Sequence, residues 1–179
     1  MQGLVQIKLG DGNAPGTEMG PLVTAAHHAR VAGYIEKGVA EGAVPLCDGR
    51  AEAAGKAGYF VGPTIFDKVT PGMTIAREEI FGPVLSVIRV DGLDDAIELV
   101  NSSPFGNTTS IFTSDGGAAR KYAHRVEAGM VGVNIGVAAP MAFFPFSGWK
   151  ASFFGDLHAH GKDAVAFYTE QKVIMTRWV

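Results

Sequence analysis

Cysteine is nearly absent from this sequence, since Cys47 is the single example among 179 residues. One cysteine cannot form an internal disulfide, which fits a reducing compartment, and we expect a cytoplasmic protein. The five histidines show no spacing with carboxylate or thiolate partners that would hold zinc, so no metal site is expected.

Runs of one charge and long apolar runs are also missing. The 15 basic and 18 acidic residues are interspersed and leave a net charge of -3. Without a basic face, we expect neither a nucleic acid nor an anionic membrane as a partner. No apolar stretch is long enough to span a bilayer, and the first eight residues carry no basic segment followed by an apolar run. The sequence is typical of an ordinary soluble protein.

Glycine is abundant, by contrast. The 24 glycines are about twice the typical share of roughly 7%, and they predict many tight turns. The hydrophobic content of 47% is sufficient for one substantial core, and the length suggests one domain.

Apolar spacing predicts alternating helices and strands. The clearest helix runs from Thr24, a good N-cap, to about Glu41, with Gly42 just beyond its end. Further helices are predicted at 93–100, 118–126 and 162–167, and strands at 44–47, 59–66, 84–90, 108–112, 130–134 and 172–178. The order predicts an α/β fold with a largely parallel sheet flanked by helices.

Two adjacent carboxylates and an aromatic residue stand between two predicted strands, in the segment 77–84. Loops at strand ends are where α/β enzymes place their chemistry. An ionised Glu79 can accept hydrogen bonds from the two neighbouring hydroxyls of a ribose, with Glu78 as its solvated neighbour. On residue type alone, simple pairing of both carboxylates with Arg77 or Lys68 on a surface turn is the commoner outcome.

A second cluster is aromatic and lies in the long irregular segment 135–157. Phe143, Phe144 and Phe146, with Met141 and Trp149, could line an apolar wall that keeps water from a reactive group. The alternative is packing in a core or at a subunit interface, because large aromatic side chains usually serve burial.

Asn134 and Cys47 are two further candidates for chemistry. Asn134 follows a predicted strand and could offer its amide to a bound carbonyl, although an asparagine that satisfies its own turn is more common. Cys47 ends a short predicted strand, where an inert small hydrophobic residue is more common than a thiolate nucleophile. No Gly-x-Gly-x-x-Gly pattern occurs, so the sequence does not encode the adenosine and pyrophosphate half of a dinucleotide site.

Three segments together resemble the C-terminal half of the NAD-dependent aldehyde dehydrogenases: Arg-Glu-Glu-Ile-Phe-Gly-Pro-Val at 77–84, Pro-Phe-Ser-Gly-Trp-Lys at 145–150 and Tyr-Thr-Glu-Gln-Lys-Val at 168–173. Residues 134–158 are most similar to the methylmalonate-semialdehyde dehydrogenases, the CoA-acylating subgroup. Ser147 and Ala151 depart from the usual pattern, which has glycine and an acidic residue there, and Ser147 could crowd a turn that needs positive φ.

The resemblance implies roles for named residues. Glu79 would hold the nicotinamide ribose of NAD, Phe81 would pack beside the nicotinamide, and the aromatic side chains at 143, 144 and 146 would shield an aldehyde and its thioester from water. The implied reaction oxidises methylmalonate or malonate semialdehyde with NAD and CoA, releasing carbon dioxide and giving propionyl-CoA or acetyl-CoA.

The resemblance also implies what this chain lacks. Residues 1–179 would form part of a catalytic domain, with the strand at 172–178 serving oligomerisation, while the Rossmann-like NAD domain and the catalytic cysteine segment would lie elsewhere. We therefore expect no catalytic residue in this chain, no activity from it alone, and a homo-oligomer. A stand-alone binding or assembly module, a relic of a truncated gene, and a hydrolytic aldehyde dehydrogenase that uses water in place of CoA remain open.

Overall fold

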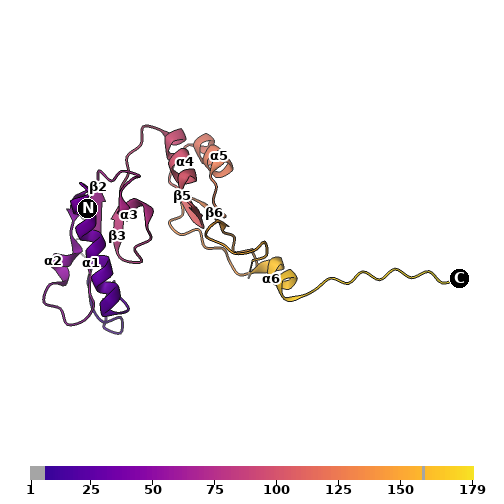
Figure 1. Cartoon of the computed structure of the whole chain (residues 1–179), viewed down its shortest axis with the longest axis horizontal. Coiled ribbons are helices and arrows are strands. Elements are labelled where there is room, and N and C mark those ends of the chain that lie inside the picture. The colour runs from indigo at the N-terminus through magenta and orange to yellow at the C-terminus, as the bar shows by residue number, and fades with distance from the viewer. Residues whose placement is uncertain (1–6, 159) are drawn as a thin grey trace. The chain divides into compact units, whose positions relative to one another are not determined.

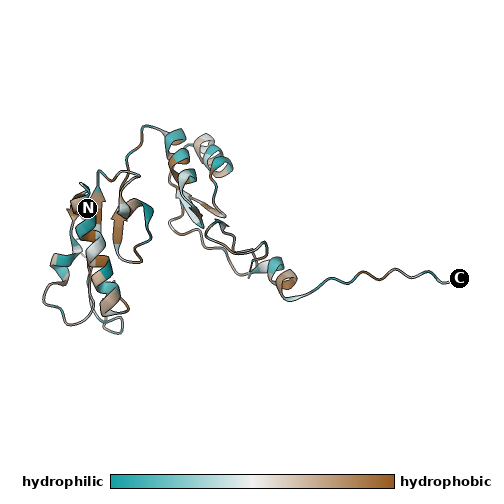
Figure 2. Cartoon of the chain, viewed as in Figure 1, coloured by the Kyte–Doolittle hydropathy of each residue, from teal (hydrophilic) through white to brown (hydrophobic). Residues whose placement is uncertain are grey.

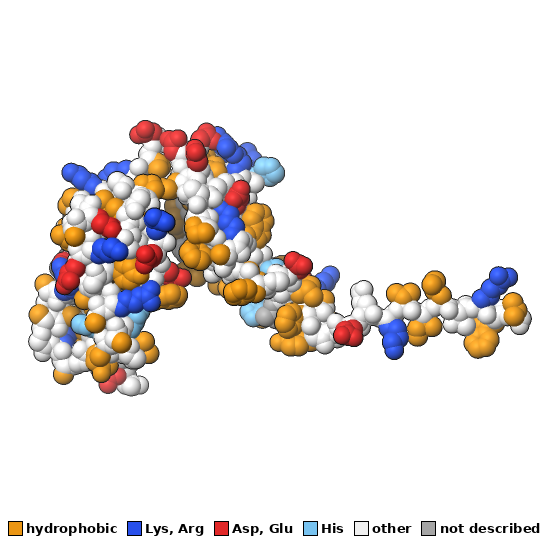
Figure 3. All heavy atoms as spheres, viewed as in Figure 1, with side chains coloured by type: hydrophobic (Ala, Val, Ile, Leu, Met, Phe, Trp, Pro, Cys, Tyr) orange, Lys and Arg blue, Asp and Glu red, His pale blue; other side chains and the backbone are white. Residues whose placement is uncertain are grey.

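The computed structural model describes residues 7–158 and 160–179. The chain divides into two compact units, the first ending at Arg89 and the second beginning at Val90 (Figure 1). The length had favoured one domain with one core, whereas the buried residues form two separate clusters, one in each unit. On the face seen in Figure 3, acidic and basic side chains are mixed in both units, as their spacing in the sequence predicted.

Helix α1 (Ala25–Ala40) confirms the clearest prediction from the sequence. The Thr24 side chain accepts a hydrogen bond from the backbone N–H of His27 at 3.1 Å, and Gly42 takes a positive φ of 98° just past the helix. Val31 and Ile35, four residues apart, are fully buried and place one side of α1 against the core of the first unit.

The first unit contains a three-stranded sheet in the order β1-β2-β3. Strand β1 (Val44–Cys47) pairs antiparallel with β2 (Thr64–Asp67), which pairs parallel with β3 (Val84–Ser86). The strand predicted at 59–66 begins only at Thr64, because Pro63 has no N–H for a ladder. The strand predicted at 84–90 ends at Ser86, where pairing with β2 ends. Two short helices, α2 (Gly49–Ala53) and α3 (Thr74–Arg77), lie in segments that had no predicted helix.

Phe66 of β2 is the largest fully buried side chain of this sheet. It packs in one cluster with Val31 and Ile35 of α1, Ile75 of α3 and Ile80 of the loop after α3. Burying each such side chain contributes about 1.5–3 kcal/mol. The loop that follows α3 is therefore tied to the core at Ile80.

The second unit repeats the alternation of helix and strand. Its elements are α4 (Leu93–Ser102), β4 (Phe105–Gly106), β5 (Thr108–Ile111), α5 (Gly116–Arg125), β6 (Met130–Val133), β7 (Trp149–Lys150) and α6 (Gly161–Tyr168). Strands β5 and β6 are parallel, as predicted, and β4 and β7 form an antiparallel pair. Ile97 of α4 and Tyr122 of α5 form the buried centre, and Asp94 of α4 pairs with Lys121 and Arg125 of α5.

The fold class is confirmed as α/β, with parallel and antiparallel pairs in three small sheets. The strand predicted at 172–178 is wrong for the chain by itself. Residues 169–179 follow α6 as extended chain without strand pairing (Figure 1), and Val173, Met175 and Trp178 are at least 84% exposed. Figure 2 shows hydrophobic residues along this tail. A strand needs a partner for its backbone groups, and the described part of the chain supplies none.

Candidate functional site

The loop at 78–83, between α3 and β3, contains two adjacent carboxylates that differ in their hydrogen bonding. The Tyr34 hydroxyl of α1 donates to Glu78 Oε2 at 2.5 Å, and the Arg30 guanidinium lies 5.5 Å from the Tyr34 ring centre and donates to its hydroxyl. Hydrogen bonding to Tyr34 raises the pKa of Arg30, whose guanidinium is charged at neutral pH even without this shift. Glu78 is thus held by α1, and the pairing with Arg77 or Lys68 that residue type had suggested is not what holds it.

Glu79 is exposed, and its backbone carbonyl accepts a long hydrogen bond of 3.5 Å from Arg30 Nη2. Its carboxylate makes no hydrogen bond or ion pair with any residue that the structure describes. An ionised carboxylate can accept two or more hydrogen bonds. Glu79 therefore retains its full acceptor capacity for a ligand, whereas that of Glu78 is partly used by Tyr34.

Phe81 has a left-handed backbone, with φ of 54°, and its side chain is 67% exposed. A bulky residue in this conformation costs about 1–3 kcal/mol and persists only where its surroundings hold it. His27 Nε2 donates to the Phe81 carbonyl at 2.7 Å. A strained aromatic residue presented to solvent is unusual in a fold stabilised by burial, and such outliers cluster at ligand sites.

Gly82 and Pro83 complete the loop. A Cβ atom on Gly82 would lie 2.8 Å from both methyl carbons of Val31 in α1, so only glycine fits this approach. The Pro83 carbonyl accepts from the backbone N–H of Thr64 at 2.8 Å, which leads the chain into β3. These contacts show that the Gly-Pro pair defines the geometry of the loop.

The aromatic cluster lies in the second unit, between β6 and α6. Phe143 and Phe144 are 66% and 56% exposed, and their ring centres lie 4.6 Å apart. Phe146 is half-buried and meets the His160 ring edge-on at 6.0 Å. The three rings therefore present a partly exposed apolar surface, and none of them is buried in a core of this chain.

The segment around that cluster is tightly built. Gly161 has φ of 63°, and a Cβ there would lie 2.8 Å from the Phe143 carbonyl, which only glycine avoids. The expectation that Ser147 would crowd a turn of positive φ is wrong, since Ser147 is not among the described residues with positive φ. A Cβ on the neighbouring Gly148 would lie 2.6 Å from the Phe153 ring, so it is Gly148 whose small size the packing requires.

Asn134 serves the backbone of its own unit. Its Oδ1 accepts from the Thr113 N–H at 2.9 Å and its Nδ2 donates to the Thr113 carbonyl at 3.0 Å, which extends the β5-β6 pairing by one rung. The side-chain amide has thus formed its bonds within the chain. This is the commoner alternative, in which the asparagine side chain satisfies the backbone of its own turn.

Cys47 is also engaged within the fold. Its Sγ donates to the Pro63 carbonyl at 3.2 Å, and burial, followed by the negative charges of Glu52 and Asp48, raises its pKa. A raised pKa keeps the thiol protonated and weakly nucleophilic at neutral pH. This agrees with an inert small residue.

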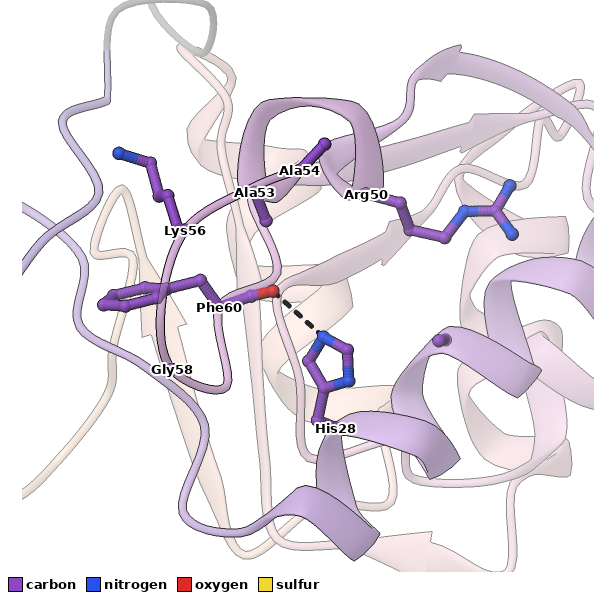
Figure 4. Close-up of a pocket in the computed structure, with 8 residues that line it drawn as sticks. His28, Arg50, Ala53, Ala54, Lys56, Gly58 and Phe60 are labelled. Carbon is purple, nitrogen blue, oxygen red and sulfur yellow. Dashed lines mark hydrogen bonds between the residues drawn. The ribbon is translucent and has the colours of Figure 1, made fainter.

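A cavity of about 280 Å³ in the first unit was not anticipated from the sequence (Figure 4). In that view His28 points to the Phe60 carbonyl, to which its Nε2 donates at 3.1 Å. The nearby Arg50 is held by Asp48 at 2.6 Å. These two polar groups are thus engaged within the chain, the Lys56 side chain also lines the cavity, and no residue of the loop at 78–83 does so.

The part of the chain that the structure describes shows neither a metal site nor a membrane span. Within residues 7–158 and 160–179, no group of three or more histidine, cysteine, aspartate or glutamate side chains could hold a metal ion. No described helix is both long enough and apolar enough to cross a bilayer.

Comparison with known proteins shows one consistent set of relatives. The aldehyde dehydrogenase family matches residues 2–174. Malonate-semialdehyde dehydrogenase 1 of Geobacillus thermodenitrificans is 56% identical over 174 residues, covering 97% of this chain and 36% of that protein. The Bacillus subtilis malonate-semialdehyde dehydrogenase is 55% identical over 175 residues, covering 98% and 36%. The chain thus spans about a third of the length of these relatives.

Solved structures agree with the sequence relatives. Methylmalonate-semialdehyde dehydrogenase from Oceanimonas doudoroffii is 46% identical with a TM-score of 0.96, over 99% of this chain and 37% of that one. The NAD+ complex of an aldehyde dehydrogenase from Bacillus cereus is 39% identical with a TM-score of 0.86, over 94% and 33%.

Proposed function

Because the chain belongs to the aldehyde dehydrogenase family, we propose that it supplies the nicotinamide-ribose loop and the substrate-side aromatic wall of an NAD-dependent semialdehyde dehydrogenase. One observation carries this proposal. The loop at 78–83 holds Glu79 with an unpaired carboxylate beside Phe81, an exposed aromatic residue in a strained left-handed conformation. A ligand with hydroxyls and a flat ring would account for both features, because its hydroxyls would bond to the carboxylate and its ring would pack on Phe81.

Glu79 is the residue that binds the ribose in this proposal, and Glu78 attaches the loop to α1. The Glu79 carboxylate accepts hydrogen bonds from the two ribose hydroxyls, while Tyr34 keeps Glu78 on α1. Phe81 offers an exposed ring against which the nicotinamide packs. NAD, when bound, supplies the acceptor for the hydride that leaves the substrate. The residues present fit the nicotinamide half of that cofactor.

The substrate class follows from the relatives, which are named for malonate and methylmalonate semialdehyde. The partly exposed rings of Phe143, Phe144 and Phe146 would exclude water from the aldehyde and from the thioester formed after oxidation. We propose CoA as the acyl acceptor, with loss of carbon dioxide and release of propionyl-CoA or acetyl-CoA. A hydrolytic aldehyde dehydrogenase is the second candidate, and it differs in releasing a free acid.

The chain alone should be inactive. Covalent aldehyde oxidation needs a thiolate nucleophile, and the pKa of Cys47 is raised while its thiol is bonded to Pro63. The nucleophile would then come from a part of the protein that this chain does not contain. NADH formation by the 179 residues alone would refute this step.

The apolar tail is proposed as an oligomerisation strand. Residues 172–178 lie extended with their apolar side chains exposed, as the space-filling view shows (Figure 3). Such a segment gains its hydrogen bonds by adding to the edge of another sheet. We propose a second copy of the same polypeptide as the partner, so that the protein is a homo-oligomer. A stand-alone binding or assembly module would use the same strand.

The experiment that tests the function joins this chain to the N-terminal part of the Bacillus subtilis relative that it does not match. The fusion should reduce NAD with malonate semialdehyde and CoA. Glu79→Gln should raise the KM for NAD about 10- to 100-fold, since hydrogen bonds to a charged group contribute about 1.5–3 kcal/mol. Glu98→Gln, an exposed residue on α4, is the matched control.

The outcomes separate the candidates. Acyl-CoA as the product supports CoA transfer, and free acid supports the hydrolytic alternative. If Glu79→Gln behaves like Glu98→Gln in an active fusion, the ribose role of Glu79 is refuted.

A further inference from the structure

One face of α1 contacts almost every residue of the loop from Glu78 to Gly82. The contacting residues are spaced i, i+3, i+4 and i+7, which places them on one side of a helix. The pairs are Tyr34 with Glu78, Arg30 with Glu79, His27 with Phe81, and Val31 with Gly82. From residue 78 to residue 81 the loop thus runs antiparallel to α1.

The His27 contact is the shortest link between α1 and the backbone of this loop. Its Nε2 lies 2.7 Å from the Phe81 carbonyl oxygen, and because a carbonyl can only accept, Nε2 carries the hydrogen. The Thr24 cap accepts a hydrogen bond from the backbone of His27. His27 therefore reaches the loop from the ordered first turn of a 16-residue helix.

Phe81 needs such a restraint. At φ of 54° its Cβ crowds its own backbone, and relaxation to an extended conformation would rotate the Phe81 carbonyl away from α1. The hydrogen bond from His27 resists that rotation at the Phe81 carbonyl. The close approach of the next residue, Gly82, to Val31 restricts the backbone that follows Phe81.

We propose that His27 is a positioning residue that holds Phe81 in its left-handed conformation, so that the Phe81 ring and the free Glu79 carboxylate face the same ligand. This rests on the proposed function of the loop. His27 acts through the Phe81 backbone and needs no contact with the cofactor itself. Without the bond, Phe81 relaxes and its ring leaves the position from which it packs on a nicotinamide.

The first test uses the 179-residue chain and measures the Phe81 backbone by NMR. In His27→Ala, the coupling constant between the amide and α protons and the 13Cα shift of Phe81 should lose their left-handed values. The order parameter of the Phe81 amide should fall from about 0.85 toward 0.6. His27→Gln keeps an N–H donor and should restore part of the loss, whereas His124→Ala, exposed on α5, should change nothing.

A second pair of variants separates positioning from general stabilisation of the fold. Glycine adopts positive φ without strain, so Phe81→Gly removes the need for the restraint. Adding His27→Ala to Phe81→Gly should change the order parameters of residues 79–82 much less than it does in the unaltered chain. Equal effects in both backgrounds would overturn the proposal, because a purely structural bond is lost to the same extent in each. This comparison also applies if His27→Ala destabilises the chain.

The fusion enzyme links the loop to catalysis. There His27→Ala should raise the KM for NAD about 3- to 10-fold, as the loss of one hydrogen bond would, and leave the KM for the semialdehyde unchanged. If the fusion reduces NAD but His27→Ala changes neither the NMR values of Phe81 nor this KM, the positioning role fails while the proposed function stands. If Phe81 relaxes but the fusion never reduces NAD, His27 still positions the loop and the proposed function fails.

Discussion

Lys150 offers the sharpest test of how the second unit is held together. Its Nζ donates to the carbonyls of Asn101 at 2.6 Å and Ser103 at 3.0 Å, at the C-terminal end of α4. It also pairs with Glu127 at 2.9 Å, and its side chain is 22% exposed. The last carbonyls of a helix lack partners within the helix, and a cation there also interacts favourably with the helix dipole. One ammonium group thus joins α4 to β7.

The change Lys150→Met keeps the apolar stem and removes the charge. Two hydrogen bonds to a charged donor contribute about 1.5–3 kcal/mol each. Asn101 and Ser103 are half-buried residues, so we take rehydration of their carbonyls to recover about half of that sum, while the ion pair with Glu127 adds at most about 1 kcal/mol. We expect a loss of about 2–3 kcal/mol in the free energy of unfolding of the second unit.

The assay is tryptophan fluorescence during urea unfolding. Both tryptophans lie in the second unit, and Trp178 is 90% exposed in the folded chain, so the signal change reports Trp149 beside Lys150. With a slope of about 1–2 kcal/mol per molar urea, the midpoint should fall by about 1–3 M. Lys162→Met, on the exposed side of α6, is the control. Equal midpoints for the two variants would refute the assigned role of Lys150.

Three further predictions concern the other features of the fold. Hydrogen bonds from the Thr74 side chain, and then from its backbone, lower the pKa of Glu41 from 4.5. A lowered pKa contributes stability above the ordinary value that is lost as pH falls through the folded value. The first unit should therefore lose stability on acidification below about pH 4.5, and Glu41→Gln should flatten that decline in a pH series of thermal melts. Cys47 should react with a thiol reagent at pH 7 more slowly than free cysteine, because burial raises its pKa; equal rates in a time course would contradict the burial. Removing residues 171–179 should leave the circular dichroism spectrum unchanged and convert an oligomer to a monomer by light scattering, and an unchanged mass would exclude the tail as the contact.

Local patterns in the sequence determined much of this fold. The helix from Ala25 and its Thr24 cap follow from apolar spacing and a capping side chain, which act within a few residues of each other. The run around Glu79 and Phe81 could be picked out because carboxylate and aromatic chemistry is a property of the residues themselves. The resemblance to aldehyde dehydrogenases was likewise carried by short motifs and is confirmed.

Only the tertiary structure decided which partners those residues find. Two adjacent glutamates are equivalent in sequence, and Tyr34, 44 residues before Glu78, makes Glu78 an anchor and leaves Glu79 free. The left-handed backbone of Phe81 depends on α1 as well, since no local pattern favours that conformation for phenylalanine. The tail at 172–178 has the composition of a strand, but a strand is a property of two paired segments, and the described chain contains only one of them.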